Sequence, residues 1–291
     1  MAIHDAYARF TPYELSIPGR EFADEHFPRI ADEGEARDAD LSDPDAFVML
    51  SAAGAALREI RGEEDDPALI EQYGDLLFHG FHFWRSGEPF YLLETGVARY
   101  LVESEPEAAG WTPSVPSVGG YVQLPWHLFW AHSEDESPVE PLDGFFWTRT
   151  PDDTLTLLAA MGMREDRPGL GVIPLPPLPM EEVGEWISER ARDPEGDAGD
   201  GGDERGADGE AGSTGEAVGA DFRSLLPGGE IDRLYSVVTA GEIVKLAALV
   251  LWYLEVFGDA VGPEERTARD PESDGPLASA LPFRRVRLGD G

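Results

Sequence analysis

The sequence predicts an α+β fold with an N-terminal helical layer, a central antiparallel β-meander of about five strands, a buried C-terminal helix, and a disordered acidic loop and tail. Three observations lead to this prediction. Apolar residues recur every three or four positions over residues 44–103, as in amphipathic helices. Short runs of β-branched and aromatic residues, separated by turn residues, follow over residues 119–175. Residues 243–257 are apolar on most sides, which indicates a helix buried in the core.

The chain divides into five segments, of which the folded ones form one cooperative domain. Residues 1–43 carry scattered aromatic side chains without a clear period, and we expect a partly ordered N-terminal arm. Residues 44–192 hold the helical layer and the sheet, and residues 222–260 complete the same domain with the C-terminal helix. Residues 193–221 contain ten acids, one arginine and many glycines, so we expect a disordered loop. Residues 261–291 are expected to be a disordered tail with an arginine-bearing end.

Start and stop signals place three helices in the helical layer. The first is expected over residues 44–61, after a capping residue and with proline at its first position. The second follows Asp66 and is expected over residues 67–85, with Ser86 and Gly87 as its stop signal. The third is expected over residues 89–103. Short links between consecutive helices predict that they pack as antiparallel neighbours.

The residue pattern changes after Trp111, where prolines and glycines separate short apolar runs. The strands are expected over residues 121–124, 127–131, 145–149, 154–161 and 170–175. The short connections between them predict an antiparallel meander.

Two further features flank the acidic loop. Four prolines at positions 174, 176, 177 and 179 predict a stiff connector into a helix near residues 181–190. Thr239 and Glu242 match a reciprocal capping box that opens the C-terminal helix. We expect that helix to be buried by both the helical layer and the sheet.

The charge of the chain excludes several classes of partner. Fifty-eight acidic residues against 22 basic ones give a formal net charge of −36, which repels phosphate backbones and anionic lipid headgroups. We therefore expect no nucleic acid and no membrane as partner. Lys245 is the only lysine, and this bias together with the acid excess is typical of a halophilic prokaryote. The start of the sequence has no apolar run, so we expect a cytoplasmic protein.

The second predicted helix carries the residues that could hold a metal. Asp75, His79 and His82 fall on one stripe, and spacings of three and four place ligand atoms on one side of a helix. Glu94 on the next helix could complete the shell, and the absence of cysteine leaves only such N and O ligands. The alternatives are a solvent-exposed polar face and a structural hydrogen bond between helices. No cofactor is predicted beyond such a divalent cation.

Aromatic residues gather around two turns of the predicted sheet. Trp126, Trp130 and Trp147, with nearby phenylalanines, exceed what one face of a small sheet needs. They could line a groove for an apolar ligand or a peptide, or fill the core.

The end of the chain combines apolar and basic residues. Phe283, Arg284, Arg285 and Arg287 lie in a tail attached to a very acidic body. Such a segment could bind the protein's own acidic surface, add a strand to a partner, or stay unstructured.

No catalytic signature is present: the sequence has no G-x-S-x-G elbow, phosphate loop, H-E-x-x-H or dinucleotide-binding glycine motif. Our leading hypothesis is a non-catalytic protein that acts through contacts with an unknown protein partner. A metal-dependent enzyme of the hydrolase type, using the His/Asp helix face, is the first alternative. An apolar ligand-binding protein is the second.

Overall fold

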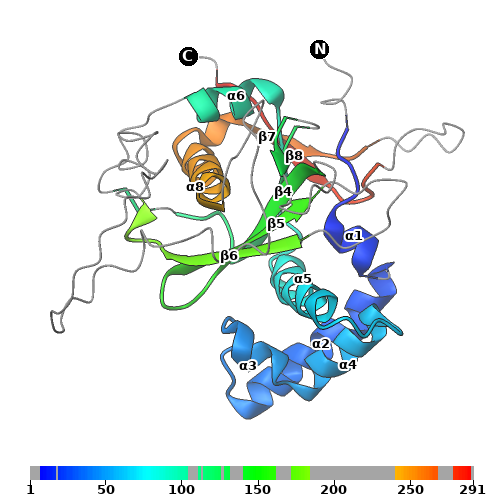
Figure 1. Cartoon of the computed structure of the whole chain (residues 1–291). Helices are drawn as coiled ribbons and strands as arrows, with labels where there is room; N and C mark the ends of the chain where they lie inside the picture. Colours follow the sequence, from blue (N-terminus) through cyan, green and yellow to red (C-terminus); the bar gives the residue numbers. More distant parts are fainter. Residues whose placement is uncertain are drawn as a thin grey trace, which may run out of the picture.

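The structure is a computed structural model of the chain (Figure 1). It describes residues 7–17, 19–103, 111–112, 114–125, 128–131, 140–161, 172–183, 240–267 and 278–289.

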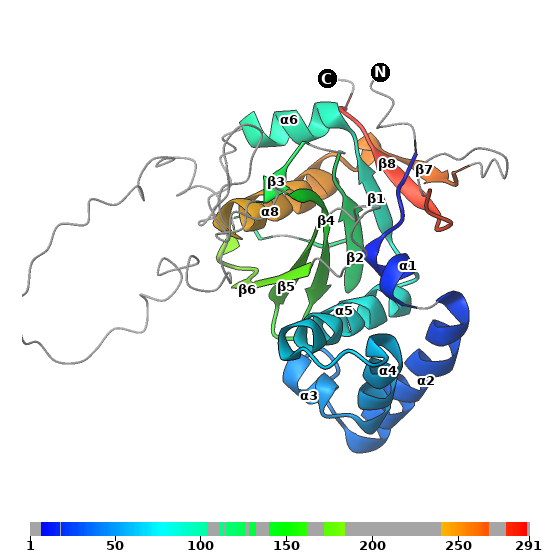
Figure 2. The ribbon, with the colours of Figure 1, turned by 45° about the vertical axis from the view of Figure 1, so that its right-hand side comes forward.

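A mixed β-sheet lies between two groups of helices (Figures 1 and 2). Its strands are β1 (Phe90–Leu93), β2 (Gly119–Gln123), β3 (Trp130–Ala131), β4 (Glu140–Arg149), β5 (Thr154–Met161), β6 (Val172–Pro179), β7 (Val261–Glu265) and β8 (Phe283–Val286). The helices are α1 (Pro12–Ser16), α2 (Gly19–Arg37), α3 (Pro44–Val48), α4 (Ser51–Arg61), α5 (Pro67–Arg85), α6 (Thr95–Glu103) and α8 (Ala240–Val256), and a short 3₁₀ turn, Gly258–Ala260, follows α8. The predicted α+β class is confirmed.

The sheet is mixed, whereas the sequence predicts an antiparallel meander. The strand order is β6-β5-β4-β2-β1-β8-β7, with β3 pairing to β4. Strands β2, β4, β5 and β6 pair antiparallel, so this part of the predicted meander is confirmed. Strand β1 pairs parallel with both β2 and β8. The chain leaves β1 through α6 before it reaches β2, and such a crossover allows parallel pairing.

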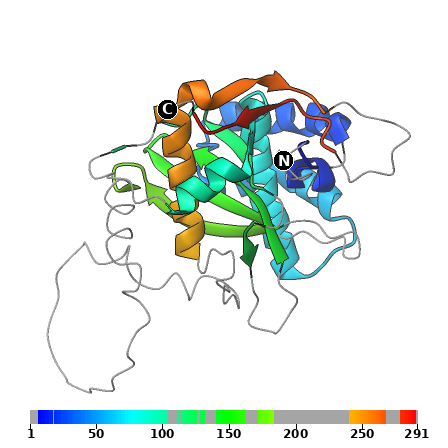
Figure 3. The same ribbon diagram turned by 90° about the horizontal axis from the view of Figure 1, so that it is seen from above.

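The two faces of the sheet bury different cores, because successive strand residues point to opposite sides. On β4, Phe145 and Trp147 pack in the core that contains α6 and α8. Phe146, between them, packs in the core formed with α1 to α5. Figure 3 shows α8 (orange) and α5 (cyan) on opposite sides of the strands. Helix α8 is therefore buried by the sheet and by α6, which is the second half of the third predicted helix, whereas the helices α3 to α5 of the predicted layer lie against the other face of the sheet.

Helix α5 matches its prediction at both ends. The Asp66 carboxylate accepts a hydrogen bond from the Ala68 amide, and Pro67 occupies the first position. At the other end, Gly87 has φ +82° and donates its amide to the Trp84 carbonyl, while the Glu88 amide reaches the Phe83 carbonyl. This is the Schellman arrangement, which favours glycine at its left-handed position.

Two predicted helices differ from the structure. The helix expected over residues 44–61 breaks into α3 and α4, with Leu50 extended between them. The helix expected over residues 89–103 is β1 followed by α6. The first half of this segment is a strand because all four side chains from Phe90 to Leu93 are buried. This pattern suits an inner strand that is covered on both faces of the sheet.

The N-terminal segment also differs from its prediction. Residues 12–37, expected to be part of an irregular arm, form α1 and α2. The Thr11 hydroxyl and the Glu14 carboxylate cap α1 reciprocally. Helix α2 contains Pro28 and has a weakly amphipathic pattern, so apolar spacing alone did not reveal it.

Both ends of the sheet correct further predictions. The prolines expected to form a connector lie in β6, an edge strand, where proline is tolerated because one side needs no amide donor. The tail expected to be disordered contains β7 and β8. The predicted helix at 181–190 lies almost wholly outside the described residues, and the acidic loop 193–221 and the capping residue Thr239 lie outside them.

The helices that the structure describes include none with the length and apolar character to cross a membrane.

Candidate functional site

The polar stripe of α5 faces the sheet and the neighbouring loop, not solvent. His79 is 5% exposed and His82 is 2% exposed. The Thr148 hydroxyl on β4 lies 3.0 Å from His79 Nδ1, and His82 Nε2 lies 2.9 Å from the Leu41 carbonyl. The solvent-face interpretation of this stripe is therefore wrong for both histidines. Both histidines make structural hydrogen bonds instead, but to a strand and to a loop, and not between helices as the structural alternative had it.

Burial keeps both imidazoles neutral. It lowers the pKa of His79 to about 3 and that of His82 to about 4, since an imidazolium loses its hydration there. A carbonyl oxygen only accepts hydrogen bonds, so His82 donates through Nε2 and its Nδ1 is the unprotonated nitrogen. This Nδ1 is buried and has no hydrogen-bond partner among the described residues.

The four candidate metal ligands do not come together. Glu94 pairs with Arg287, 3.3 Å away, beside β8. His79 and His82 are held separately, by β4 and by Leu41. Among the described residues, no group of three or more His, Asp or Glu side chains could hold a metal ion.

Asp75, the remaining candidate, lies one turn before His79. Its Oδ2 is buried without a hydrogen-bond partner among the described residues. Desolvation, and then the charge of Glu71, raise the pKa of Asp75 to about 6.

Of the three tryptophans proposed to line a groove, Trp147 belongs to the core. Its side chain is fully buried, and its indole Nε1 donates to the Ser117 carbonyl at 3.3 Å. Trp126 and the side chain of Trp130 lie outside the described residues.

The arginine-bearing end is part of the sheet. Phe283 is 2% exposed in the core shared with α5. Arg285 pairs with Glu265 at 3.2 Å, and Arg287 pairs with Glu94. Arg284 is exposed. The segment is thus an inner strand of the protein's own sheet, with two of its arginines paired to acidic side chains, an arrangement that none of the three predicted alternatives described.

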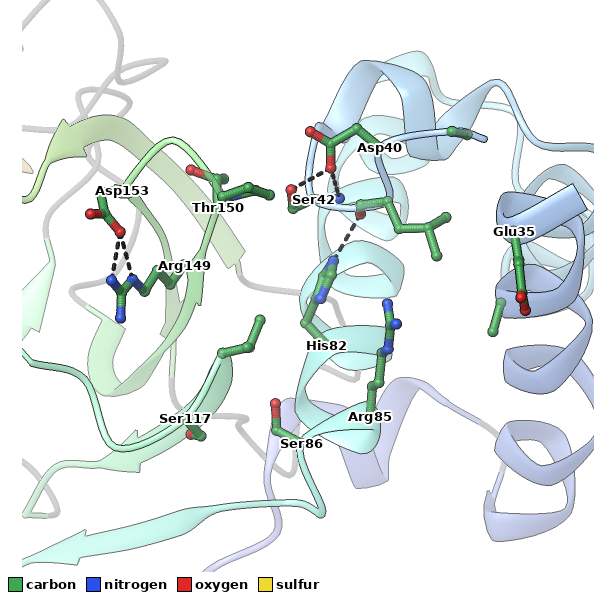
Figure 4. Close-up of a pocket in the computed structure, with 15 residues that line it drawn as sticks. Glu35, Asp40, Ser42, His82, Arg85, Ser86, Ser117, Arg149, Thr150 and Asp153 are labelled. Carbon is green, nitrogen blue, oxygen red and sulfur yellow. Dashed lines mark hydrogen bonds and ion pairs between the residues drawn. The ribbon is translucent and has the colours of Figure 1, made fainter. Parts of the chain in front are cut away.

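A cleft of about 870 Å³ opens where the polar stripe of α5 ends (Figure 4). Four parts of the chain form its walls: α2 with the loop up to Ser42, the last turn of α5, residues 117–118 before β2, and residues 149–153 between β4 and β5. Its polar side chains are Glu35, Asp40, Ser42, His82, Arg85, Ser86, Ser117, Arg149, Thr150 and Asp153.

Hydrogen bonds hold these walls in place. His82 fixes the loop through Leu41, and Asp40 Oδ1 accepts bonds from the Ser42 amide and hydroxyl. The Gly119 amide donates to the Ser86 hydroxyl oxygen at 3.0 Å. A Cβ on Gly119 would lie 2.8 Å from the His82 carbonyl carbon, so only glycine allows α5 and β2 to approach this closely.

The charges in the cleft are unevenly paired. Arg149 forms a two-pronged ion pair with Asp153 through Nε at 3.0 Å and Nη2 at 2.5 Å. Arg85 is exposed and forms no ion pair with any described residue; its guanidinium lies 6.0 Å from the centre of the Phe81 ring. Figure 4 shows Arg85 reaching along the cleft between α5 and α2. The arrangement offers a cation, two carboxylates and several hydroxyls to a bound molecule.

Sequence reasoning missed this cleft. His82 was on the predicted polar stripe, and the stripe does end at the cleft. Arg85, Glu35, Asp40 and Thr150 carried no signal, because they come from segments that are neighbours only in the folded chain.

A second polar cluster is buried around Asp143 on β4, near the end of that strand away from the cleft, and it has a structural role. Asp143 Oδ1 accepts from Arg9 Nε at 3.0 Å and Nη2 at 2.7 Å, and Oδ2 accepts from the Tyr121 hydroxyl at 2.5 Å. Gln123 Nε2 donates to the same carboxylate, and its Oε1 accepts from the Arg9 amide. Burial, and then the charge of Asp143, hold the pKa of Tyr121 well above its usual value. This cluster fastens the N-terminal segment to β2 and β4.

A comparison with models of known protein families gives no match, and a comparison with curated proteins gives none either.

Proposed function

We propose that this protein binds a small polar molecule in the cleft between α2, α5 and the β4–β5 turn. The observation that carries the proposal is Arg85, a cation without an ion pair among the described residues, at the wall of a cleft of about 870 Å³. The volume is in the range of small-molecule sites, about 300–1,000 Å³. This replaces the apolar ligand predicted from the sequence with a charged or polar one, because the ionic side chains of Arg85, Glu35 and Asp40 line the cleft beside its apolar surface.

The proposal is of binding and not of catalysis. Both imidazoles of α5 remain neutral. Each is also held by a structural hydrogen bond, His79 with the Thr148 hydroxyl and His82 with the Leu41 carbonyl. The lining hydroxyls of Ser86 and Thr150 also hold backbone groups: Ser86 accepts from Gly119, and Thr150 bonds the Thr154 backbone. Fixed hydroxyls of this kind suit recognition, since they position a ligand at little cost in ordering.

A thermal-shift screen tests the proposal. Small molecules grouped as anions, cations, zwitterions and neutral compounds are added to the wild type, to Val118→Trp, and to Val256→Trp. Val118 lines the cleft and is 52% exposed, while Val256 on α8 is 50% exposed and lies outside the cleft. A ligand at about 100 times its Kd adds about 2.7 kcal/mol to the free energy of unfolding.

We expect at least one compound to raise the melting temperature of the wild type and of Val256→Trp but not of Val118→Trp, which fills the cleft. The proposal is wrong if no compound stabilises the wild type, or if every stabilising compound acts equally on all three proteins.

A protein partner, the leading hypothesis of the sequence analysis, is a second candidate function. The C-terminal segment that could have added a strand to a partner no longer supports this candidate, because β8 lies between β1 and β7 of the protein's own sheet. Another surface favours it: Tyr100 and Leu288 are exposed apolar side chains around Tyr253. The Tyr100 and Tyr253 ring centres lie 6.3 Å apart, and the Gly289 amide, next to Leu288, donates to the Tyr253 hydroxyl.

Matched surface variants test the second candidate. Tyr100→Ser with Leu288→Ser removes this apolar surface, and Val48→Ser with Met49→Ser removes an exposed apolar pair near α3. If the candidate is right, a protein that copurifies in stoichiometric amount is lost from the first variant and retained by the second. Equal retention by both variants would rule this surface out.

A further inference from the structure

We propose that the ligand of the cleft is a zwitterion of short-peptide size, with its carboxylate at Arg85 and its ammonium group at one of the two acidic side chains, Glu35 or Asp40, on the wall formed by α2 and its following loop. This inference rests on the proposed function and names the class of molecule that the cleft takes.

Some charged side chains that line the cleft have no ion-pair partner among its described residues. Arg149 and Asp153 neutralise one another through two hydrogen bonds. Burial keeps His82 neutral. One cation, Arg85, and two carboxylates, Glu35 and Asp40, remain among the lining residues.

The remaining cation and the two carboxylates belong to different walls of the cleft. Arg85 belongs to the last turn of α5, whereas Glu35 lies on α2 and Asp40 in the loop that follows it (Figure 4). Arg85 and Asp40 both lie close enough to influence the charge of His82, Arg85 as a cation and Asp40 as an anion. A ligand that reaches across the cleft therefore meets opposite charges at its two sides.

The charges around the cleft favour a ligand that has no net charge. A simple anion would pair with Arg85 but would face Glu35 and Asp40 and the field of a chain with formal charge −36. A simple cation would pair with the carboxylates and would face Arg85. A zwitterion pairs at both walls and, having no net charge, is not repelled at long range.

The other lining residues of the cleft suit the rest of such a molecule. Leu41, Val118 and Pro151 offer apolar contacts, and the Ser117 hydroxyl oxygen, whose proton is donated to the Gly119 carbonyl, can accept a hydrogen bond from a peptide amide. A chain of about three residues spans about 10 Å, which a site of this volume accommodates.

Isothermal titration calorimetry with three forms of one probe tests the inference. The probes are trialanine with both ends free, its N-acetyl form, and its C-terminal amide, used at about 0.15 M salt, where charges act over about 8 Å. We expect each cap to weaken binding by about fivefold, the size of effect that one partly exposed ion pair produces.

Variants assign each end to its wall. In Arg85→Gln we expect the penalty of the C-terminal amide to disappear and that of the N-acetyl group to persist. In Glu35→Gln with Asp40→Asn we expect the reverse, and the new amide oxygen at position 40 keeps an acceptor for Ser42. The controls Arg99→Gln and Asp32→Asn, at positions outside the cleft, leave both penalties unchanged.

The outcomes separate this inference from the proposed function. The inference is overturned if free trialanine binds no more tightly than its capped forms, or if no form binds while the screen finds another ligand that Val118→Trp excludes. In that second case the proposed function stands. Both fail if no compound and no peptide binds in the cleft.

Discussion

Two histidines on α5 make the protein sensitive to acid at the scale of single residues. In the folded state burial lowers the pKa of His79 to about 3 and of His82 to about 4, against an ordinary value of 6.5. Below about pH 6.5 the unfolded chain binds protons that the folded protein does not. The free energy of unfolding therefore falls as the pH drops from about 6.5 toward 4, by up to about 1.4 kcal/mol per pH unit for each histidine.

The double variant His79→Asn with His82→Gln tests this linkage. Asn keeps an acceptor for the Thr148 hydroxyl and Gln keeps a donor for the Leu41 carbonyl, but neither side chain titrates. Between pH 7.5 and 5.0, urea denaturation should show the wild type losing about 4 kcal/mol more than the variant. An equal loss in both proteins would contradict the prediction.

Asp75 acts in the opposite direction and does not disturb the comparison. With a raised pKa of about 6, its carboxyl group takes up a proton in the folded state before it does so in the unfolded chain. It therefore favours the folded state as the pH falls through 6 toward 4. Because Asp75 is the same in the wild type and the double variant, its contribution cancels.

At the scale of elements, β8 is the feature that most changes the interpretation of the sequence. Its arginines and apolar residues had suggested a peptide for a partner, but the strand pairs with β1 and β7 of its own sheet. Two acids, Glu94 and Glu265, pair with Arg285 and Arg287. They lie 20 or more positions away along the chain, so no local pattern could have identified them.

Phe283→Ala should therefore destabilise the protein severely. The side chain is buried in the core shared with α5, and removing it leaves a cavity that costs about 3–5 kcal/mol. Leu288→Ala, five residues later at a 52% exposed position, should change the free energy of unfolding by no more than about 0.5 kcal/mol. Chemical denaturation measures both, and similar values for the two variants would mean that β8 is dispensable.

Local signals predicted some elements well and others not at all. The start and end of α5 and the full extent of β5 were predictable, because capping residues and turn residues act over a few positions. Strand β1 was predicted as helix, since four consecutive apolar residues fit either structure until their neighbours are known. The cleft could not be predicted, because its walls meet only through the packing of α5 on the sheet.

At the scale of the whole molecule, the cluster around Asp143 joins distant parts of the chain. Arg9 reaches Asp143, 134 positions away. Beside it, Glu14 accepts bonds from the Ser279 hydroxyl and the Ala280 amide, which fastens the segment before β8 to α1. The segments before α1 and before β8 are thus held to the body of the protein by polar bonds.

A double-mutant cycle measures this connection. Arg9→Met or Asp143→Leu alone leaves a charged partner in the interior, which costs about 3–5 kcal/mol. The two together leave no charge unmatched between them, so the double variant should be clearly more stable than the sum of the single losses predicts. Additive losses in urea denaturation would show that the pair is not coupled.

The inner position of β8 also bears on how the protein is made. Among the strands that the structure describes, β8 is the last to be synthesised, and until it emerges β1 exposes its open edge on the side that β8 and β7 will cover. The nascent chain consequently cannot complete its native sheet while the ribosome still holds β8. A premature stop or a frameshift shortly before Phe283 would release a product with an unpaired strand edge, a species suited to aggregation or to recognition by chaperones and proteases.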